Sequence, residues 1–241
     1  MPLDPAIARA IGVQSALQSA AGADPQDLLD RLADPRRSIP AGRVPAVTAE
    51  LVTAVFGAAS QRGSDHGRPL ADLDLPAGVR TLSGEVVDAE RAWVLDEPWL
   101  AQVIDAARLV PGGGDPARVA EVFDLPLAST QVRVGQVRAG QNADTEHSTN
   151  PDSALRRAAG ALGVDIADRE PTVIPGLLVT VDGASVRVRW WGSGDRLWVD
   201  GSAEAAGRAV AWAAHRWSDR HTAIAAARGA VVELAEDGLD R

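Results

Sequence analysis

Residues 177–200 read LLVTVDGASVRVRWWGSGDRLWVD, and this stretch decides the fold. Turn sequences at 182–183 and 192–195 separate three short runs rich in β-branched and aromatic residues. Runs of this length joined by Asp-Gly and Gly-rich turns are typical of antiparallel strands. We therefore expect a meander whose strands cover 177–181, 185–191 and 196–200.

The second run predicts two chemically different faces, because side chains alternate along a strand. Val186, Val188 and Trp190 would share one face, and the opposite face would carry arginines and tryptophans. Such a face is either covered by other parts of the chain or exposed for a partner. The pattern favours coverage, and exposure stays open as the alternative. The candidate interaction surface consists of Arg187, Arg189, Trp191, Arg196 and Trp198.

Two helices are expected after the meander. Ser202 would cap an alanine-rich helix, and a second helix would begin near His221. Consecutive helices after a sheet indicate that they cover its apolar face. The apolar stripes expected on these helices are Ala206, Val210, Ala213 and Trp217 on the first, and Ile224, Ala227, Val231 and Leu234 on the second.

The N-terminal part reads as short helices. Asp4, Asp24 and Asp115 each precede a proline, the arrangement of an N-cap followed by the first helical residue. Apolar residues at helical spacing predict helices after Asp24 and across 47–56. The fold class is therefore α+β: an antiparallel β meander packed against C-terminal helices, after a small helical N-terminal region. We expect a helical region at 1–69 and an α+β domain at 70–241.

The centre of the chain reads as short strands and helices without a parallel βαβ rhythm. A polar segment, 140–151, is expected to be a loop because it holds almost no apolar surface. The expected strands are 79–82, 86–87, 92–95 and 131–137, and the expected helices are 98–107 and 116–123.

Composition excludes several kinds of site. All 24 basic residues are arginine, so no lysine exists for a phosphate-binding loop, a Schiff base, a Ser-Lys dyad or a kinase site. There is no cysteine to form a disulfide or a thiolate metal site. The net charge of −9 is concentrated in 70–150, which carries −7, and no basic tract is present to bind nucleic acid. We expect no membrane span, no signal peptide and a cytoplasmic location.

Motifs that resemble catalytic or cofactor sites are weak. Residues 112–117, GGGDPA, match G-x-G-x-x-A, but Asp115 would cap the helix and repel a pyrophosphate. The spacing of His66, His147, His215 and His221 favours surface or helix-terminal histidines over a metal site. No G-x-S-x-G occurs. We therefore predict no catalytic residue, no cofactor and no metal.

Four segments carry a resemblance to a known family: DPAIARAIGV (4–13), LLDRLADP (28–35), DLPLAS (124–129) and GRAVAWAA (207–214). Through them the chain resembles the C-terminal region of actinobacterial sacsin N-terminal ATP-binding-like proteins, whose N-terminal part is a GHKL-type ATPase. The resemblance implies a chaperone-like setting in which this region lacks the ATPase chemistry. It supplies no site residue, because the family's functional residues lie in the ATPase part.

The leading hypothesis is a non-enzymatic interaction or regulatory module that contacts a protein partner or the ATPase domain of the same protein. Two alternatives stay open. One is a stand-alone hydrolase with dispersed catalytic residues, near Asp65-His66 or an acidic pair such as Glu85 with Asp88 or Asp96 with Glu97. The other is an acidic decoy or inhibitor that binds a basic partner through 70–150.

Overall fold

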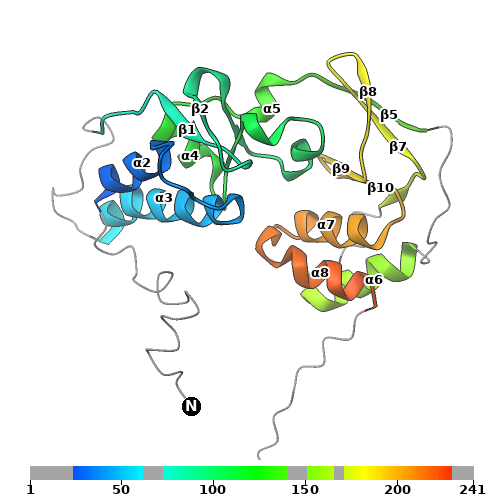
Figure 1. The fold of residues 1–241 in the computed structure, drawn as a ribbon. Coiled ribbons are helices and arrows are strands. Elements are labelled where there is room, and N and C mark those ends of the chain that lie inside the picture. The colour runs from blue at the N-terminus through cyan, green and yellow to red at the C-terminus, as the bar shows by residue number, and fades with distance from the viewer. Residues whose placement is uncertain (1–23, 62–72, 141–150, 166–170, 230–241) are drawn as a thin grey trace, which may run out of the picture. The chain divides into compact units, whose positions relative to one another are not determined.

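The computed structural model describes residues 24–61, 73–140, 151–165 and 171–229. The chain divides into two compact units. Unit 1 contains 1–97 and 104–131, and unit 2 contains 98–103 and 132–241. The boundary expected near residue 69 lies outside the described residues, and the units divide the chain elsewhere, so the first helices belong with the central strands (Figure 1).

Unit 1 packs helices around two small sheets. Strands β1 and β2 pair antiparallel, whereas β3 and β4 pair parallel, a pairing that the sequence pattern did not predict. Buried side chains from α2, α3, β3 and α4, such as Leu29, Leu51, Val94 and Val122, form one core. Its helices and strands are α2 (Pro25–Ala33), α3 (Val44–Gln61), β1 (Gly78–Arg80), β2 (Val86–Asp88), β3 (Trp93–Leu95), β4 (Leu109–Pro111), α4 (Pro116–Phe123) and α5 (Ala128–Gln131), with 3₁₀ helices η2 (Ala41–Arg43), η4 (Ala89–Arg91) and η6 (Ala106–Arg108).

Helix starts in unit 1 follow the predicted capping. The Asp24 carboxylate accepts a hydrogen bond from the Gln26 N–H at 3.0 Å, and Asp115 accepts one from the Arg118 N–H at 3.2 Å. Both helices begin with the proline that follows the cap. The cap expected at Asp4 lies outside the described residues.

In its described residues, unit 2 contains two three-stranded sheets and three α-helices. One sheet has the order β5-β7-β8, and the other has the order β6-β10-β9, with β6 parallel to β10. Helices α6, α7 and α8 lie against one another around a core of mainly alanine side chains (Figure 1). The elements are η5 (Pro98–Gln102), β5 (Val134–Ala139), α6 (Pro151–Leu162), β6 (Thr172–Val173), β7 (Leu177–Val181), β8 (Ala184–Arg187), β9 (Trp190–Ser193), β10 (Arg196–Val199), α7 (Ala203–Ala213), η8 (Trp217–Asp219) and α8 (Arg220–Ala227).

The mixed α+β class, the antiparallel hairpins and the C-terminal helices are confirmed, but the continuous strand at 185–191 is wrong. The run breaks at Val188 and Arg189, so that β8 joins one sheet and β9 the other. Trp190 and Trp191 are each 1% exposed. Adjacent side chains of a strand point to opposite faces, so the burial of both tryptophans requires both faces of β9 to be covered. A strand in a sheet with one face in solvent does not meet this requirement.

Other differences concern the helices. The α-helix expected at 98–107 is absent: η5 ends at Gln102 and η6 begins at Ala106, although Leu100 and Ile104 are buried. Helix α7 ends at Ala213, so Trp217 lies in the following 3₁₀ turn. Val231 and Leu234 lie outside the described residues, as does nearly all of the polar segment 140–151. Helix α6 was not predicted, although Asn150-Pro151 carries the same signal of a polar residue before a proline as Asp24-Pro25.

Helices α7 and α8 approach so closely at Gly207 that this position requires glycine. An added Cβ atom would lie 2.5 Å from the Ile224 Cα atom and 2.6 Å from its backbone nitrogen. We expect Gly207→Ala to lower the free energy of unfolding of unit 2 by about 1–3 kcal/mol, because overpacking displaces backbone here. Urea denaturation followed by tryptophan fluorescence reports on this unit, which holds six of the seven tryptophans.

Gly160 in α6 is the matched control. It is exposed, and an added Cβ atom would meet nothing within 4 Å. Gly160→Ala should raise the same free energy by about 0.5–1 kcal/mol, because alanine loses less backbone entropy in a helix. Equal effects of the two substitutions would contradict the close helix contact.

Candidate functional site

The five residues of the predicted Arg/Trp surface do not form one face. Trp191 is buried against Trp99 of η5, with ring centroids 3.6 Å apart. Trp198 lies opposite Trp191 in the β9–β10 register and is half-buried. Arg187 is at the end of β8 in the other sheet, and Arg196 is exposed at the start of β10.

Tryptophan packing explains why this surface is interrupted. Trp190 contacts Trp212 of α7 and Trp217 of η8, with centroids 6.1 and 5.7 Å away. Trp191 contacts η5. Since the two residues point to opposite faces of β9, each face is covered by a different element of unit 2. Coverage, the reading favoured by the sequence, therefore holds for Trp191.

Arg189, the remaining predicted residue, belongs to a different group of charges. Its guanidinium lies 2.9 Å from a carboxylate oxygen of Glu204. Two further arginines reach the same carboxylate, Arg208 at 2.8 Å and Arg228 at 3.5 Å. Among the residues that the structure describes, Glu204 is the only carboxylate within salt-bridge distance of any of these three.

A fourth arginine, Arg220, adds to this positive charge. Burial, and then the neighbouring charge of Arg208, lowers the pKa of the Arg220 guanidinium from its ordinary value. Arg220 also lies over the ring of Trp217, 5.3 Å from its centroid, and donates to the Trp217 carbonyl at 3.0 Å. We call Glu204, Arg189, Arg208, Arg220 and Arg228 the Glu204 cluster; four arginines and one glutamate give it a formal charge of +3.

The cap of α7, the spacing of residues along α7 and a hydrogen bond to the link between β8 and β9 position the residues of this cluster. Ser202 caps α7 by accepting a hydrogen bond from the Ala205 N–H at 3.2 Å, which places Glu204 in the first turn, where the helix dipole favours a negative charge. Arg208 follows one helical turn later. The Arg189 N–H donates to the Gln102 side-chain oxygen at 2.8 Å, which holds the link between β8 and β9.

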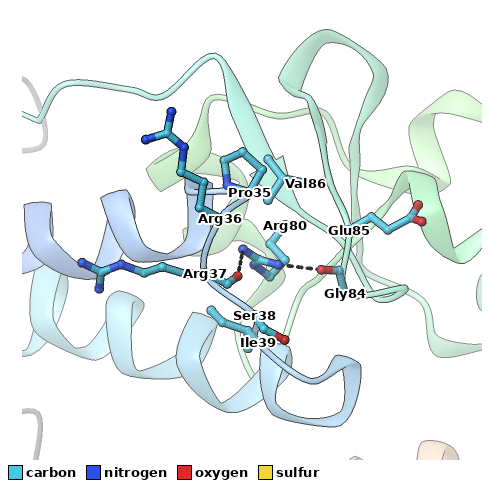
Figure 2. A pocket seen from close by; sticks show the side chains of 9 residues that line it. All are labelled: Pro35, Arg36, Arg37, Ser38, Ile39, Arg80, Gly84, Glu85 and Val86. Atoms are coloured by element: carbon cyan, nitrogen blue, oxygen red, sulfur yellow. Dashed lines mark hydrogen bonds between the residues drawn. The ribbon is translucent and has the colours of Figure 1, made fainter.

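A second candidate site, in unit 1, was missed by sequence reasoning. Arg80, at the end of β1, is 5% exposed and donates to the carbonyls of Gly84, Asp34 and Arg37 at 2.6, 2.6 and 2.8 Å. It is one of the residues that line a pocket of about 470 Å³ (Figure 2). The only signal in the sequence was a charged residue within a short apolar strand, which alone predicts nothing about burial.

The weak motifs take structural roles where they are described. Asp115 caps α4, and a Cβ atom at Gly112 would lie 2.1 Å from the Leu95 carbonyl oxygen, so the glycine run permits a tight turn beside β3. Asp96 accepts hydrogen bonds from the Ser129 N–H and hydroxyl, and Asp88 accepts one from the Glu90 N–H.

Two of the four histidines, His215 and His221, lie in the described ranges. His215 follows α7 with a φ of 55°, and His221 is exposed in the first turn of α8. Within the described ranges, no three His, Asp or Glu side chains are grouped so as to hold a metal ion. His66 and His147, and with them Asp65-His66, lie outside these ranges.

Among the residues that the structure describes, no helix combines the length and apolarity needed to cross a membrane.

We expect Glu204→Gln to lower the free energy of unfolding of unit 2 by about 1–2 kcal/mol, because it leaves Arg189, Arg208 and Arg228 without a counter-charge. The loss should grow at low salt, where repulsion between the arginines is screened less. Urea denaturation at two salt concentrations measures it. Glu121→Gln, at an exposed position of α4, should change neither the free energy of unfolding nor its dependence on salt. An equal change in both variants would contradict the electrostatic role of the cluster.

Comparisons with known proteins found no relative with which the Glu204 cluster or the Arg80 pocket could be compared. No family model matches the chain, and no curated protein or solved structure matches it significantly. The functional interpretation depends on the geometry of the Glu204 cluster and of the Arg80 pocket.

Proposed function

We propose that this chain is a non-enzymatic interaction module that binds an acidic segment of a partner protein through the Glu204 cluster. One observation carries the proposal: a single carboxylate is shared by three arginines, and a fourth adds its charge beside them. Arg189 and Arg228 remain 62% and 59% exposed, so their guanidinium groups are accessible to a further carboxylate.

The chemistry favours a peptide carboxylate over a nucleic acid. Arginine presents a planar fork of donors that matches a carboxylate in a bidentate geometry. The cluster is confined to α7, the two ends of α8 and the link between β8 and β9, and the chain as a whole carries −9. A nucleic acid would meet repulsion from that charge over a long backbone, whereas a short acidic segment contacts the cluster alone.

The resemblance described from the sequence extends this proposal. In a chaperone-like ATP-binding protein, the module would act in the cytoplasm and contact the ATPase domain of the same protein or a client. An ATPase domain encoded in frame upstream, with an acidic segment that binds the cluster, would support this extension. Binding of the acidic segment can be tested without it.

The test uses a fluorescein-labelled oligo-glutamate peptide and the full chain, with binding measured by fluorescence anisotropy. Arg189→Gln and Arg228→Gln should each weaken binding about threefold to fivefold, since an exposed ion pair contributes up to about 1 kcal/mol. Higher salt should weaken binding of the unmodified chain.

Two further variants make the experiment specific. Arg156→Gln, at an exposed position of α6 outside the cluster, should bind as the unmodified chain does. Arg196→Gln should also have no effect, although Arg196 belonged to the surface predicted from the sequence. The proposal is wrong if an oligo-glutamine peptide binds equally well, or if all four substitutions weaken binding alike.

A further inference from the structure

We infer that the pocket around Arg80 in unit 1 is a binding site for a small molecule that carries an oxyanion, either a carboxylate or a phosphate group. This site is independent of the Glu204 cluster, which belongs to unit 2. The inference depends on three observations: the burial of the Arg80 charge, its incomplete set of acceptors, and the charge and size of the cavity beside it.

The Arg80 charge is buried without a counter-ion. Only 5% of the residue is exposed, and among the described residues no carboxylate lies within salt-bridge distance of its guanidinium. The nearby Asp34 carboxylate is directed elsewhere, accepting from the Arg36 N–H at 2.9 Å and lying 3.6 Å from the Arg37 Nε atom. A buried charge that has no opposite charge nearby is unfavourable, so a bound anion would relieve this cost.

The hydrogen bonds of Arg80 leave donors unused. A guanidinium has five N–H groups, and three of them meet the carbonyls of Gly84, Asp34 and Arg37. The Nε atom is buried without any hydrogen-bond partner. A purely structural role, tying the loop after α2 to the turn between β1 and β2, explains the three bonds but leaves the charge and the Nε–H unsatisfied.

The cavity has the charge that an anion requires. Three arginines border it, Arg36, Arg37 and Arg80, against Glu85, and Asp34 forms an ion pair with Arg37, so that these five residues together carry a formal charge of +1. Ser38 also borders the cavity and adds a hydroxyl donor. In Figure 2 the Arg36, Arg37 and Glu85 side chains point away from the Arg80 guanidinium.

The size of the cavity selects a small ligand. A volume of about 470 Å³ falls in the range of small-molecule sites and is too small for a folded partner. Carboxylates and phosphates are both oxyanions whose oxygen atoms accept hydrogen bonds from a guanidinium group. The ligand class is therefore a metabolite-sized carboxylate or phosphate ester.

The charges of Arg36 and Glu85 provide the test. Replacing Arg80 itself would remove three hydrogen bonds to backbone carbonyls, so a loss of binding could not be distinguished from unfolding. Full-length protein labelled with nitrogen-15 is titrated with sodium phosphate and separately with sodium succinate, each at constant ionic strength against sodium chloride. We expect saturable shifts of the Ser38, Gly84 and Glu85 amide signals. Shifts with phosphate alone identify a phosphate ligand, and shifts with succinate identify a carboxylate ligand.

Charge variants must then change the affinity in opposite directions. Glu85→Gln should tighten binding of the active anion about twofold to threefold, and Arg36→Gln should weaken it by a similar factor. Arg91→Gln, an exposed arginine of the same unit that does not line the pocket, should leave it unchanged. The inference is overturned if neither anion shifts these amides more than chloride does, or if Glu85→Gln and Arg36→Gln change the affinity equally.

Discussion

Within each unit, hydrogen bonds from arginine guanidinium groups to backbone carbonyls join segments at the points where helices and turns end. In unit 2, Arg157 of α6 donates to two carbonyl oxygens at the end of α8, at 3.1 and 2.6 Å. Arg216, which precedes α8, donates at 2.6 Å to the carbonyl of Leu162 at the end of α6. Helix ends leave carbonyls without partners inside the helix, and a cation there also interacts favourably with the helix dipole. The two arginines thus join α6 and α8 reciprocally.

Arginines with structural roles differ from those proposed to bind ligands in how their charge is balanced. Arg216 is neutralised by Asp219, 2.7 Å away, and Arg157, which directs all three nitrogen atoms of its guanidinium to uncharged protein acceptors, is exposed to water that screens its charge. Arg80 meets three carbonyls but no carboxylate, and the Glu204 cluster has four arginines for one carboxylate. Backbone carbonyls satisfy donors without cancelling a full charge. The uncancelled charge is therefore what both proposed sites offer to an anion.

Local sequence signals predicted many of the elements because each depends on residues close along the chain. The caps at Asp24, Asp115 and Ser202 and the hairpin turn at 182–183 are all present where they are described. The parallel pairs β3–β4 and β6–β10 were missed, since each joins segments with no hairpin turn between them. The Arg/Trp surface was wrong as a single face, because alternation was extended through a break that only packing of Trp190 and Trp191 imposes.

The sequence by itself determined the α+β class, the helix caps and the exclusion of lysine-dependent chemistry, because composition and short-range spacing fix these properties. Only the tertiary structure decided that Arg80 is buried and that Glu204 pairs with arginines from the link between β8 and β9, from α7 and from the C-terminal end of α8. These contacts join residues far apart in the chain, Arg80 to Asp34 and Glu204 to Arg228 among them. Their formation depends on which faces of the helices and strands are buried in the core, and the spacing of apolar residues along the sequence does not predict this.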